Sequence, residues 1–382
     1  MGIYLDYNAS APIDPRVLSV MIDIYKNHFG NADSRTHDFG EDVRSITETA
    51  RGQVANLLGV KKDEVFFTSG ATESNNLAIL GLRSFGEAKN KMHIITSSIE
   101  HKAVLGAVKF LSENGFEVEY IDPDESGRVD PQKLISMIRP ETLLVSLMHV
   151  NNETGIIQPV KEIGDYLRGT ETFFHIDATQ SCGKLVEEIR DLHYDLMSIS
   201  AHKMQGPQGI GALIMRKKRY RLPPVKPIMY GGGQEHGIRP GTLPTALIAG
   251  FGEACAIAEN EAEQNIVKCR KIKKQLHELL EVSCVNYALN GDQNYSVPTT
   301  LNVSFLCVSS EALMLATKQY CGVSNGSACT SSSYSHSHVL SAMNLPAERI
   351  ESAIRLSWSY DVDLVSLTKE WLKFLEVVRS LQ

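Results

Sequence analysis

The feature that most constrains the fold of this chain is an alternation of short apolar runs with segments of helical character. The apolar runs occur at residues 65–70, 93–98, 143–150, 172–178, 195–200 and 211–216. Continuous apolar runs of this length, separated by helices, are typical of parallel strands that are buried on both faces. The alternation therefore predicts an α/β chain with a doubly wound sheet, in which ligands bind at the carboxyl ends of the strands.

The pattern changes beyond about residue 255. A long charged helix is predicted over about 254–282, and strand-like runs follow at 299–305 and 353–359 before a terminal helix. This mixture indicates a second, smaller α+β unit.

We therefore expect two domains. The large domain, with the sheet, spans 16–255, and the small domain combines 1–15 with 256–382. The small domain carries a segment at about 322–338 that is rich in glycine and serine.

Composition restricts the possible partners. The formal net charge is −7, whereas surfaces that bind nucleic acid are strongly basic, so we expect no direct binding of nucleic acid. No segment has the length needed to span a bilayer, and we expect no membrane association. Seven cysteines are scattered without a C-x-x-C pair, which is typical of thiols in a reducing compartment. We expect a cytoplasmic protein.

Polar side chains that could take part in ligand binding or catalysis follow two of the predicted strands. Gly70 permits a tight turn, and Thr72 stands at the start of a helix whose free N–H groups suit an anion. Asp177 ends an apolar run, where a carboxylate needs a cationic partner such as a protonated heterocyclic nitrogen. Each residue has a structural alternative, because each could simply cap the following helix.

The segment SISAHKMQGPQG (198–209) carries the sharpest signal. Ser200, His202 and Lys203 follow a strand, and a turn rich in glycine and proline comes after them. Most lysines are solvated surface charges, but partial burial lowers a lysine pKa and permits Schiff-base chemistry.

Further candidates follow other strands. His101 ends one strand and the amides Asn151 and Asn152 end another, while Arg239 and Thr242 lie in a glycine-rich loop that could be only a linker. Individually, most of these residues are better explained structurally. Together they bring an anion cradle, an amide, an Asp, a Lys and a His to one sheet edge, which is what a pyridoxal phosphate site requires.

The segment SNGSACTSSSYSHSH (324–338) places Cys329 among serines and glycine, although buried cysteines usually have apolar neighbours. Such a segment can move, and a thiol on it can visit more than one place. An incidental thiol in a disordered segment is the alternative. A metal site formed by Cys329, His336 and His338 would lack a fourth ligand and a rigid frame, so no metal is expected.

The assembled motifs resemble those of the cysteine desulfurases. The resemblance rests on YLDYNASAP, SGATESNN, VNNETG, HIDATQS, SAHKMQGPQGIGAL, GGGQE, RPGT, SNGSACTS and AIRLSWS, in the order of that family. The long segment that contains Cys329 resembles the cysteine loop of one branch of the class-V aminotransferase family, the branch in which that loop is mobile. The resemblance implies pyridoxal phosphate fold type I (aspartate aminotransferase-like), with a large, mainly parallel seven-stranded-type sheet domain and a small α+β domain.

The resemblance also implies roles for individual residues. Lys203 would bind pyridoxal 5'-phosphate covalently, His101 would stack on the ring and assist proton transfer, and Cys329 would accept the sulfur. Asp177 would face the ring nitrogen. The implied cofactor-binding set is Ala71, Thr72, His101, Asn152, Asp177, Gln180, Ser200, His202, Lys203 and Thr242, the last from the other subunit of a homodimer. The implied substrate-binding set is Arg355, Asn152 and Asn8.

The implied reaction converts L-cysteine to L-alanine and passes the sulfur, as a persulfide on Cys329, to an acceptor protein. That acceptor could serve iron-sulfur cluster assembly, tRNA thiolation or DNA phosphorothioation. Two alternatives remain: another fold type I enzyme, either an aminotransferase or a selenocysteine/cysteine lyase, or a non-catalytic scaffold that binds the cofactor.

Overall fold

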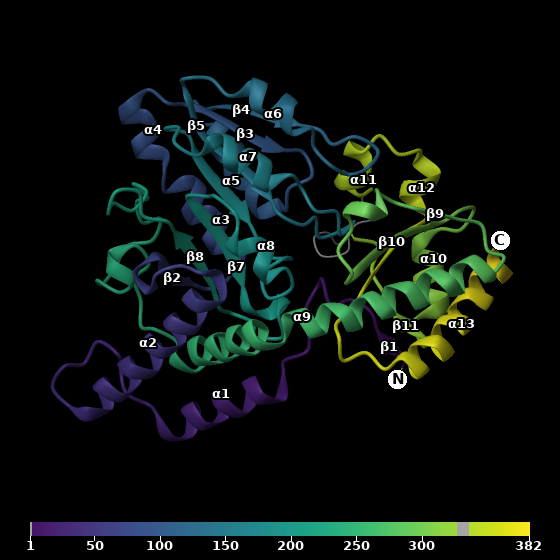
Figure 1. Cartoon of the computed structure of the whole chain (residues 1–382), viewed down its shortest axis with the longest axis horizontal. Helices are drawn as coiled ribbons and strands as arrows, with labels where there is room; N and C mark the ends of the chain where they lie inside the picture. The colour runs from purple at the N-terminus through teal and green to yellow at the C-terminus, as the bar shows by residue number, and fades with distance from the viewer. Residues whose placement is uncertain (1, 327–335) are drawn as a thin grey trace.

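A computed structural model describes residues 2–326 and 336–382 of the chain and contains a large central sheet (Figure 1). Within these residues the sheet has seven strands in the order β2-β8-β7-β6-β5-β3-β4. In chain order they are β2 (Val65–Thr68), β3 (His93–Ser97), β4 (Glu117–Ile121), β5 (Thr142–Met148), β6 (Phe173–Asp177), β7 (Leu196–Ser200) and β8 (Gly211–Met215). β8 runs antiparallel to β2 and β7, and the remaining pairings are parallel. The mainly parallel α/β sheet is confirmed.

Both faces of this sheet are buried, because successive strand residues point into different hydrophobic cores. Phe67 and Ile95 contribute to one core, and their neighbours Phe66 and Ile94 contribute to the other. The first core is covered by α2 (Asp38–Leu58), α7 (Val160–Leu167) and part of α9 (Thr245–Val282), and the second by α3 (Ala71–Leu80) and α5 (Lys102–Ser112). This arrangement explains why the strands are continuous apolar runs.

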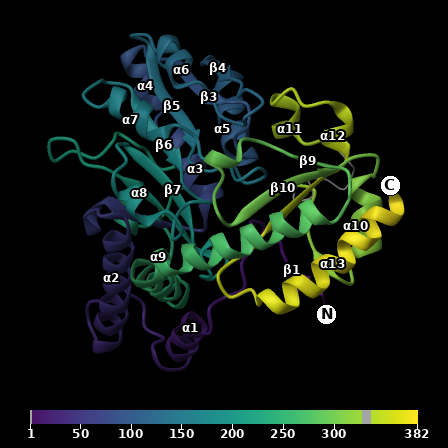
Figure 2. The same cartoon turned by 45° about the vertical axis from the view of Figure 1, so that its right-hand side comes forward.

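A smaller antiparallel sheet lies beside the large one (Figure 2). Its order is β12-β10-β9, with β9 (Tyr287–Leu289), β10 (Thr300–Phe305) and β12 (Ala353–Ser357). Its core contains Phe305, Trp371 and Phe374, the last two from α13 (Leu364–Leu381). The N-terminal strand β1 (Ile3–Tyr4) pairs with β11 (Cys321–Gly322), so the beginning of the chain joins this second unit.

The helix α9 contributes to the cores of both units, and Figure 1 shows it running from one to the other. Ile248 and Phe251 belong to the core of the large sheet, whereas Ile272 and Leu276 belong to that of the small one. The sequence interpretation began this helix near residue 254, and the structure begins it at Thr245. The same interpretation missed the strand β4.

The remaining helices connect these elements. They are α1 (Pro15–Asn27), α4 (Arg83–Lys89), α6 (Pro131–Met137), α8 (Val186–Arg190), α10 (Ser310–Thr317), α11 (His338–Ala342) and α12 (Ala347–Glu351). Among the helices of the described residues, none is both long and apolar enough to cross a membrane.

Candidate active site

A cavity of about 910 Å³ opens at the carboxyl ends of the central strands. Most of the site residues expected from the sequence line it: Asn8, Ala71, Thr72, His101, Asn152, Asp177, Gln180, Ser200, His202, Lys203 and Arg355. They lie at the start of α3 and α5, at or just after the ends of β5, β6 and β7, on β12 and in the N-terminal segment, so the fold brings together residues that are far apart in the sequence. Cys329 lies outside the described residues.

One end of the cavity is formed by the start of α3. Gly70 occupies the N-cap with φ 149°, a conformation that side chains rarely adopt, and β8 packs against it so closely that a Cβ on Gly211 would lie 2.8 Å from its Cα. The backbone N–H groups of Ala71 and Thr72 stand at the positive end of the α3 dipole, where an anion is stabilised. Ser200, at the end of β7, lies across the turn from Gly70.

His202 completes the polar wall near Ser200. Burial, and to a smaller extent the charge of Lys203, lowers the pKa of His202 to about 4, so its imidazole is neutral at neutral pH. A neutral imidazole still has one N–H to donate to an anionic oxygen. The start of α3, Ser200 and His202 therefore supply the donors that a phosphate group requires.

Asp177 ends β6 and is held by two hydrogen bonds. The Asn75 side chain, from the buried face of α3, donates to Asp177 Oδ2 at 2.8 Å, and the Thr179 backbone N–H donates to Oδ1 at 3.0 Å. Both bonds fix the plane of the carboxylate, which suits it to accept a hydrogen bond from a protonated ring nitrogen. Sequence reasoning missed Asn75, which lies 102 residues from its partner.

Lys203 ends a short helical turn, Ala201–Lys203, that follows β7. Its Nζ donates to the backbone oxygens of Asn8 at 2.6 Å and Ala9 at 2.7 Å, both in the N-terminal segment. Asn8 O also accepts from Gln180 Nε2 at 3.0 Å, so this carbonyl holds two residues of the cavity wall. The Asn8 side chain donates to Asn152 O and Thr300 Oγ1, which fixes its orientation.

His101 occupies the N-cap of α5. Its Nδ1 accepts the Ala103 backbone N–H at 3.1 Å, so the neutral ring carries its proton on Nε2. Burial lowers the pKa of His101, the charge of Asp177 opposes this shift, and Lys203 and His338 add to it. A second proton on Nδ1 would break the helix cap, so the fold favours His101 as a neutral donor.

Arg355, on β12, brings a cation to the opposite side of the cavity and is only 2 % exposed. It donates to Asp6 Oδ1 at 2.6 Å and to Asn152 O at 3.0 Å. Its buried Nε has no acceptor among the described residues. Arg355 therefore retains donor capacity for a carboxylate ligand.

The two chain segments that flank residues 327–335 are both fixed at the cavity. Ser324 pairs through its backbone with Arg355, and Gly326 lines the cavity. After the gap, His336 and His338 line the cavity, and Ser337 donates to the buried carboxylate of Glu153 at 2.5 Å.

Two charged residues near the cavity, the fully buried Glu100 and the partly buried Lys184, were not anticipated from the sequence. Glu100 accepts hydrogen bonds from Ser97 and from the Met148 backbone, and burial raises its pKa to about 8. Lys184 donates to Gln180 Oε1 at 3.4 Å, and burial, with a contribution from Lys203, lowers its pKa to about 8. Only their tertiary surroundings distinguish them from ordinary surface charges.

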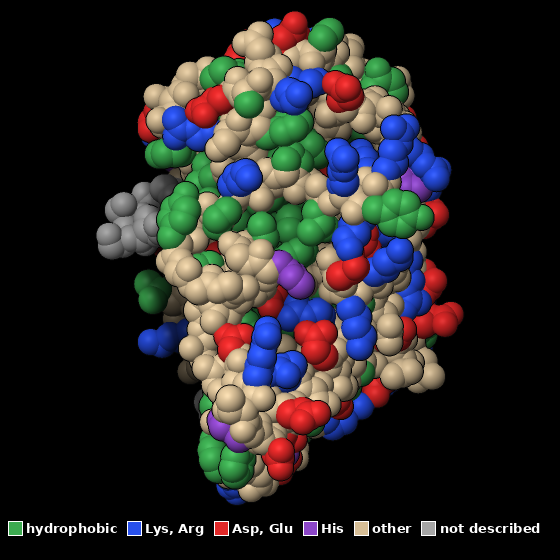
Figure 3. All heavy atoms as spheres, turned by 90° about the vertical axis from the view of Figure 1, so that its left-hand side faces the viewer, with side chains coloured by type: hydrophobic (Ala, Val, Ile, Leu, Met, Phe, Trp, Pro, Cys, Tyr) green, Lys and Arg blue, Asp and Glu red, His purple; other side chains and the backbone are tan. Residues whose placement is uncertain are grey.

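Thr242 does not line the cavity of its own chain among the described residues, and it is exposed. Thr242 lies in the stretch between β8 and α9, residues 216–244. Glu235 anchors this stretch by accepting hydrogen bonds from Arg51 and the Phe67 backbone. Tyr220 and Tyr230 in the same segment are 94 % and 88 % exposed. Figure 3 shows hydrophobic side chains exposed among charged ones on this side of the molecule.

The fold and the cavity define a class of protein that holds an anionic heterocyclic cofactor between a helix N-terminus and a carboxylate. The chain belongs to the class-V aminotransferases, because the family model "Aminotransferase class-V" matches residues 3–363. This family depends on pyridoxal 5'-phosphate, and the cavity fits that cofactor: the α3 donors suit its phosphate, Asp177 its ring nitrogen and Lys203 its aldehyde.

Individual proteins are similar to this chain over most of its length. A cysteine desulfurase IscS from Anaeromyxobacter dehalogenans is 45 % identical over 354 residues, which cover 92 % of this chain and 86 % of the relative. Among solved structures, a NifS-like protein is 35 % identical with a TM-score of 0.91, covering all of both chains. DndA from Streptomyces lividans is 42 % identical with a TM-score of 0.81, covering 92 % of this chain and 98 % of the other. The expected fold type I architecture is confirmed.

Proposed function

We propose that this chain is a cysteine desulfurase that converts L-cysteine to L-alanine and passes the sulfur to an acceptor protein. The observation that carries the proposal is the meeting of Lys203, Asp177 and Arg355 in one cavity, with both flanks of the segment that contains Cys329 fixed at its wall. Similarity to relatives named cysteine desulfurase supports the same activity.

The substrate is oriented by residues on opposite walls. Arg355 binds the carboxylate of cysteine through N–H donors that its bonds to Asp6 and Asn152 leave available, and Asn152 and Asn8 also line the cavity. Lys203, the residue that would hold the cofactor, would also supply the amine that removes the Cα proton of the bound substrate. When bound, pyridoxal 5'-phosphate supplies an electron sink for the electrons left on Cα.

The cofactor is held by the residues that line the rest of the cavity. Ala71, Thr72, Ser200 and His202 bind its phosphate through N–H and O–H donors. Asp177 would accept from its ring nitrogen and keep that nitrogen protonated. Asn152, Gln180 and His101, which line the same cavity, would contact the ring.

The sulfur transfer step is assigned to Cys329. Its thiolate attacks the substrate sulfur and forms an S–S bond, while the C–S bond breaks and its electron pair stays on the substrate carbon. Protonation of that carbon, together with return of a proton to Cα, gives alanine and leaves a persulfide on Cys329. Cys329 follows Gly326 by three residues, a span of at most about 11 Å, so the covalent chain allows its thiol to enter the cavity.

His101 assists proton transfer in this scheme. In its neutral form it donates from Nε2, and it accepts a proton at Nδ1 only if the bond from the Ala103 N–H breaks. If His101 is the base that takes the proton of the Cys329 thiol, this step includes breaking the N-cap of α5.

The working form is a homodimer in the cytoplasm, with Thr242 reaching the cofactor phosphate of the other subunit. The exposure of Thr242, and of Tyr220 and Tyr230 in the same stretch between β8 and α9, supports a contact between copies. The chain is divided into a large domain at 16–255 and a small domain formed by 1–15 and 256–382. The acceptor belongs to iron-sulfur cluster assembly, tRNA thiolation or DNA phosphorothioation.

The variant Cys329→Ser tests the proposal, and Cys307→Ser, which removes an exposed thiol elsewhere, is the matched control. Alanine and sulfide formation from L-cysteine should be lost in the first variant and kept in the second, with the visible absorbance of the cofactor present in both. Turnover retained by Cys329→Ser would favour an aminotransferase or lyase. A non-catalytic scaffold would be favoured if the purified protein shows no visible cofactor band that requires Lys203.

A further inference from the structure

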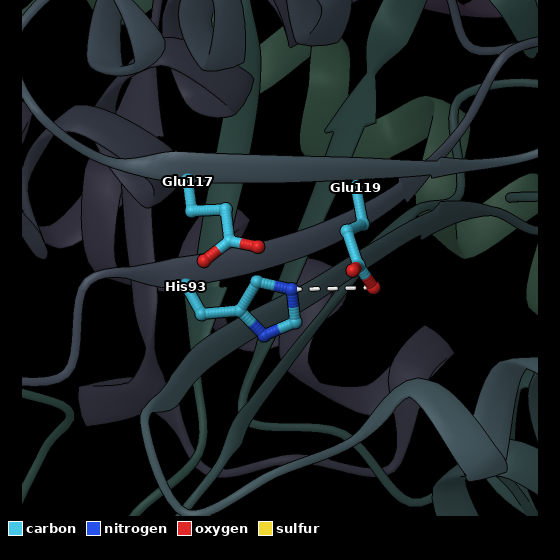
Figure 4. Close-up of side chains that lie close together, drawn as sticks. All are labelled: His93, Glu117 and Glu119. Atoms are coloured by element: carbon cyan, nitrogen blue, oxygen red, sulfur yellow. Dashed lines mark ion pairs between the residues drawn. The ribbon is translucent and has the colours of Figure 1, made fainter.

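A cluster of potential metal ligands lies at the sheet edge opposite the cavity. His93 and Glu117 are the first residues of β3 and β4 and pair directly in the parallel register, and Glu119 lies two residues further along β4. Residues two apart on a strand share a face, so the three side chains extend from the same face of the sheet (Figure 4). One ligand atom from each of the three lies within 4.8 Å of the others.

The buried imidazole of His93 is the observation that points to a ligand. His93 is 1 % exposed, and its Nδ1 makes a 2.9 Å hydrogen bond with Thr142 Oγ1. Its Nε2 has no hydrogen-bond partner among the described residues, and it faces Glu119 Oε2 at 3.5 Å (Figure 4). Either tautomer leaves this nitrogen poorly satisfied, because a proton there makes no hydrogen bond and a lone pair there faces a carboxylate.

Two neighbouring side chains hold members of the cluster in place. The bond to Thr142 fixes the ring through Nδ1, as the partners of metal-binding histidines commonly do. Arg139 pairs with Oε2 of Glu117 and restrains that carboxylate.

We propose that His93, Glu117 and Glu119 bind a zinc ion. One imidazole nitrogen and two carboxylate oxygens are a ligand set that zinc accepts, with water in the fourth position. Zinc bonds of about 2.0–2.2 Å would draw the three side chains together. Glu117 is exposed and Glu119 half-buried, so both can rotate towards His93 without repacking the core.

The position of the cluster defines its role. β4 is an edge strand of the large sheet and pairs only with β3 among the described residues. A metal ion would connect the two strands through their side chains, in addition to their backbone hydrogen bonds. Because the cluster lies at the amino ends of β3 and β4 and the cofactor cavity lies at the carboxyl ends, the ion would stabilise the sheet edge and take no part in catalysis.

The test compares two variants of the full-length, cofactor-loaded chain, both carrying Cys329→Ser to remove one competing thiol. Glu119→Gln removes a ligand with little change of shape, and Glu113→Gln, which changes an exposed glutamate near the start of β4, is the matched control. After treatment with a chelator, each protein is dialysed against Zn²⁺ and its bound zinc is measured. Its Tm is recorded with and without the ion.

The control should bind one more zinc ion per chain than Glu119→Gln and should gain a zinc-dependent increase in Tm that Glu119→Gln lacks. Co²⁺ bound in place of zinc should give ligand-field bands in the control without strong thiolate charge-transfer bands. Equal zinc contents and equal Tm responses in the two proteins would overturn the proposal. Glu117→Gln provides a second, independent ligand removal with the same expected result.

Discussion

The substitution Asn75→Ala tests whether the orientation of Asp177 controls activity. Asn75 is fully buried and donates to Asp177 Oδ2 at 2.8 Å, so the substitution removes one of the two described hydrogen bonds that hold this carboxylate. A buried hydrogen bond to a charged group contributes about 1.5–3 kcal/mol. If the proposed contact of Asp177 with the ring nitrogen weakens by this amount in the transition state, turnover falls roughly 10- to 150-fold.

The assay is alanine formation per bound cofactor, with cofactor content measured from visible absorbance and stability from Tm. Asn76→Ala is the matched control, because Asn76 is the next residue of α3 and donates only to the backbone oxygen of Thr72 in the described contacts. The control should keep its turnover. If Asn75→Ala turns over within twofold of the parent at full cofactor occupancy, the argument for Asp177 orientation is refuted.

Three further predictions concern groups around the cavity. Both His101→Asn and His101→Ala remove the imidazole and should lose turnover. Asn keeps an N-cap side chain for α5 and Ala does not, so only the alanine variant should lose about 1 kcal/mol of stability in thermal unfolding. Equal Tm values for the two variants would contradict the cap assignment. Burial raises the pKa of Glu100 from 4.5 to about 8, so the folded chain retains a proton that the unfolded chain releases. The stability of the folded chain should therefore fall by about 1.4 kcal/mol per pH unit between roughly pH 4.5 and 8. The Tm of Glu100→Gln relative to that of the parent should rise over this range. Tm values of the two proteins that change with pH in the same way would refute the prediction. Arg355→Lys loses the planar donor set and should raise KM for cysteine by about tenfold without a change in cofactor absorbance; an unchanged KM would exclude Arg355 from carboxylate binding.

The sequence predicted the strands of the large sheet where the hydrophobic pattern was continuous. It missed β4 because Glu117 and Glu119 interrupt the apolar pattern of an edge strand that is buried less than the central strands. It also began α9 too late, at about residue 254. Gly250 and Gly252 discourage a helix prediction, but they allow close packing: a Cβ on Gly250 would lie 2.7 Å from Met21 Cγ.

The structure brings together in one cavity residues that the sequence singled out from local motifs. Lys203, Asp177 and Thr72 each follow a strand, and strand topology brings them to one edge. Asn75 and Glu100 were not predicted, because their roles depend on partners from other elements: Asn75 bonds to Asp177 on β6, and Glu100 accepts from Met148 on β5. No local spacing encodes such contacts.

The most direct test of the central claim is to identify the residue that binds the cofactor. Cofactor-loaded protein is reduced with borohydride and digested, and the peptides are analysed by mass spectrometry. The account predicts that the pyridoxyl group is attached to Lys203. Attachment to Lys184 would contradict the account, as would the absence of any modified lysine. Lys184 is the alternative to exclude, because burial, with a contribution from the charge of Lys203, lowers its pKa to about 8.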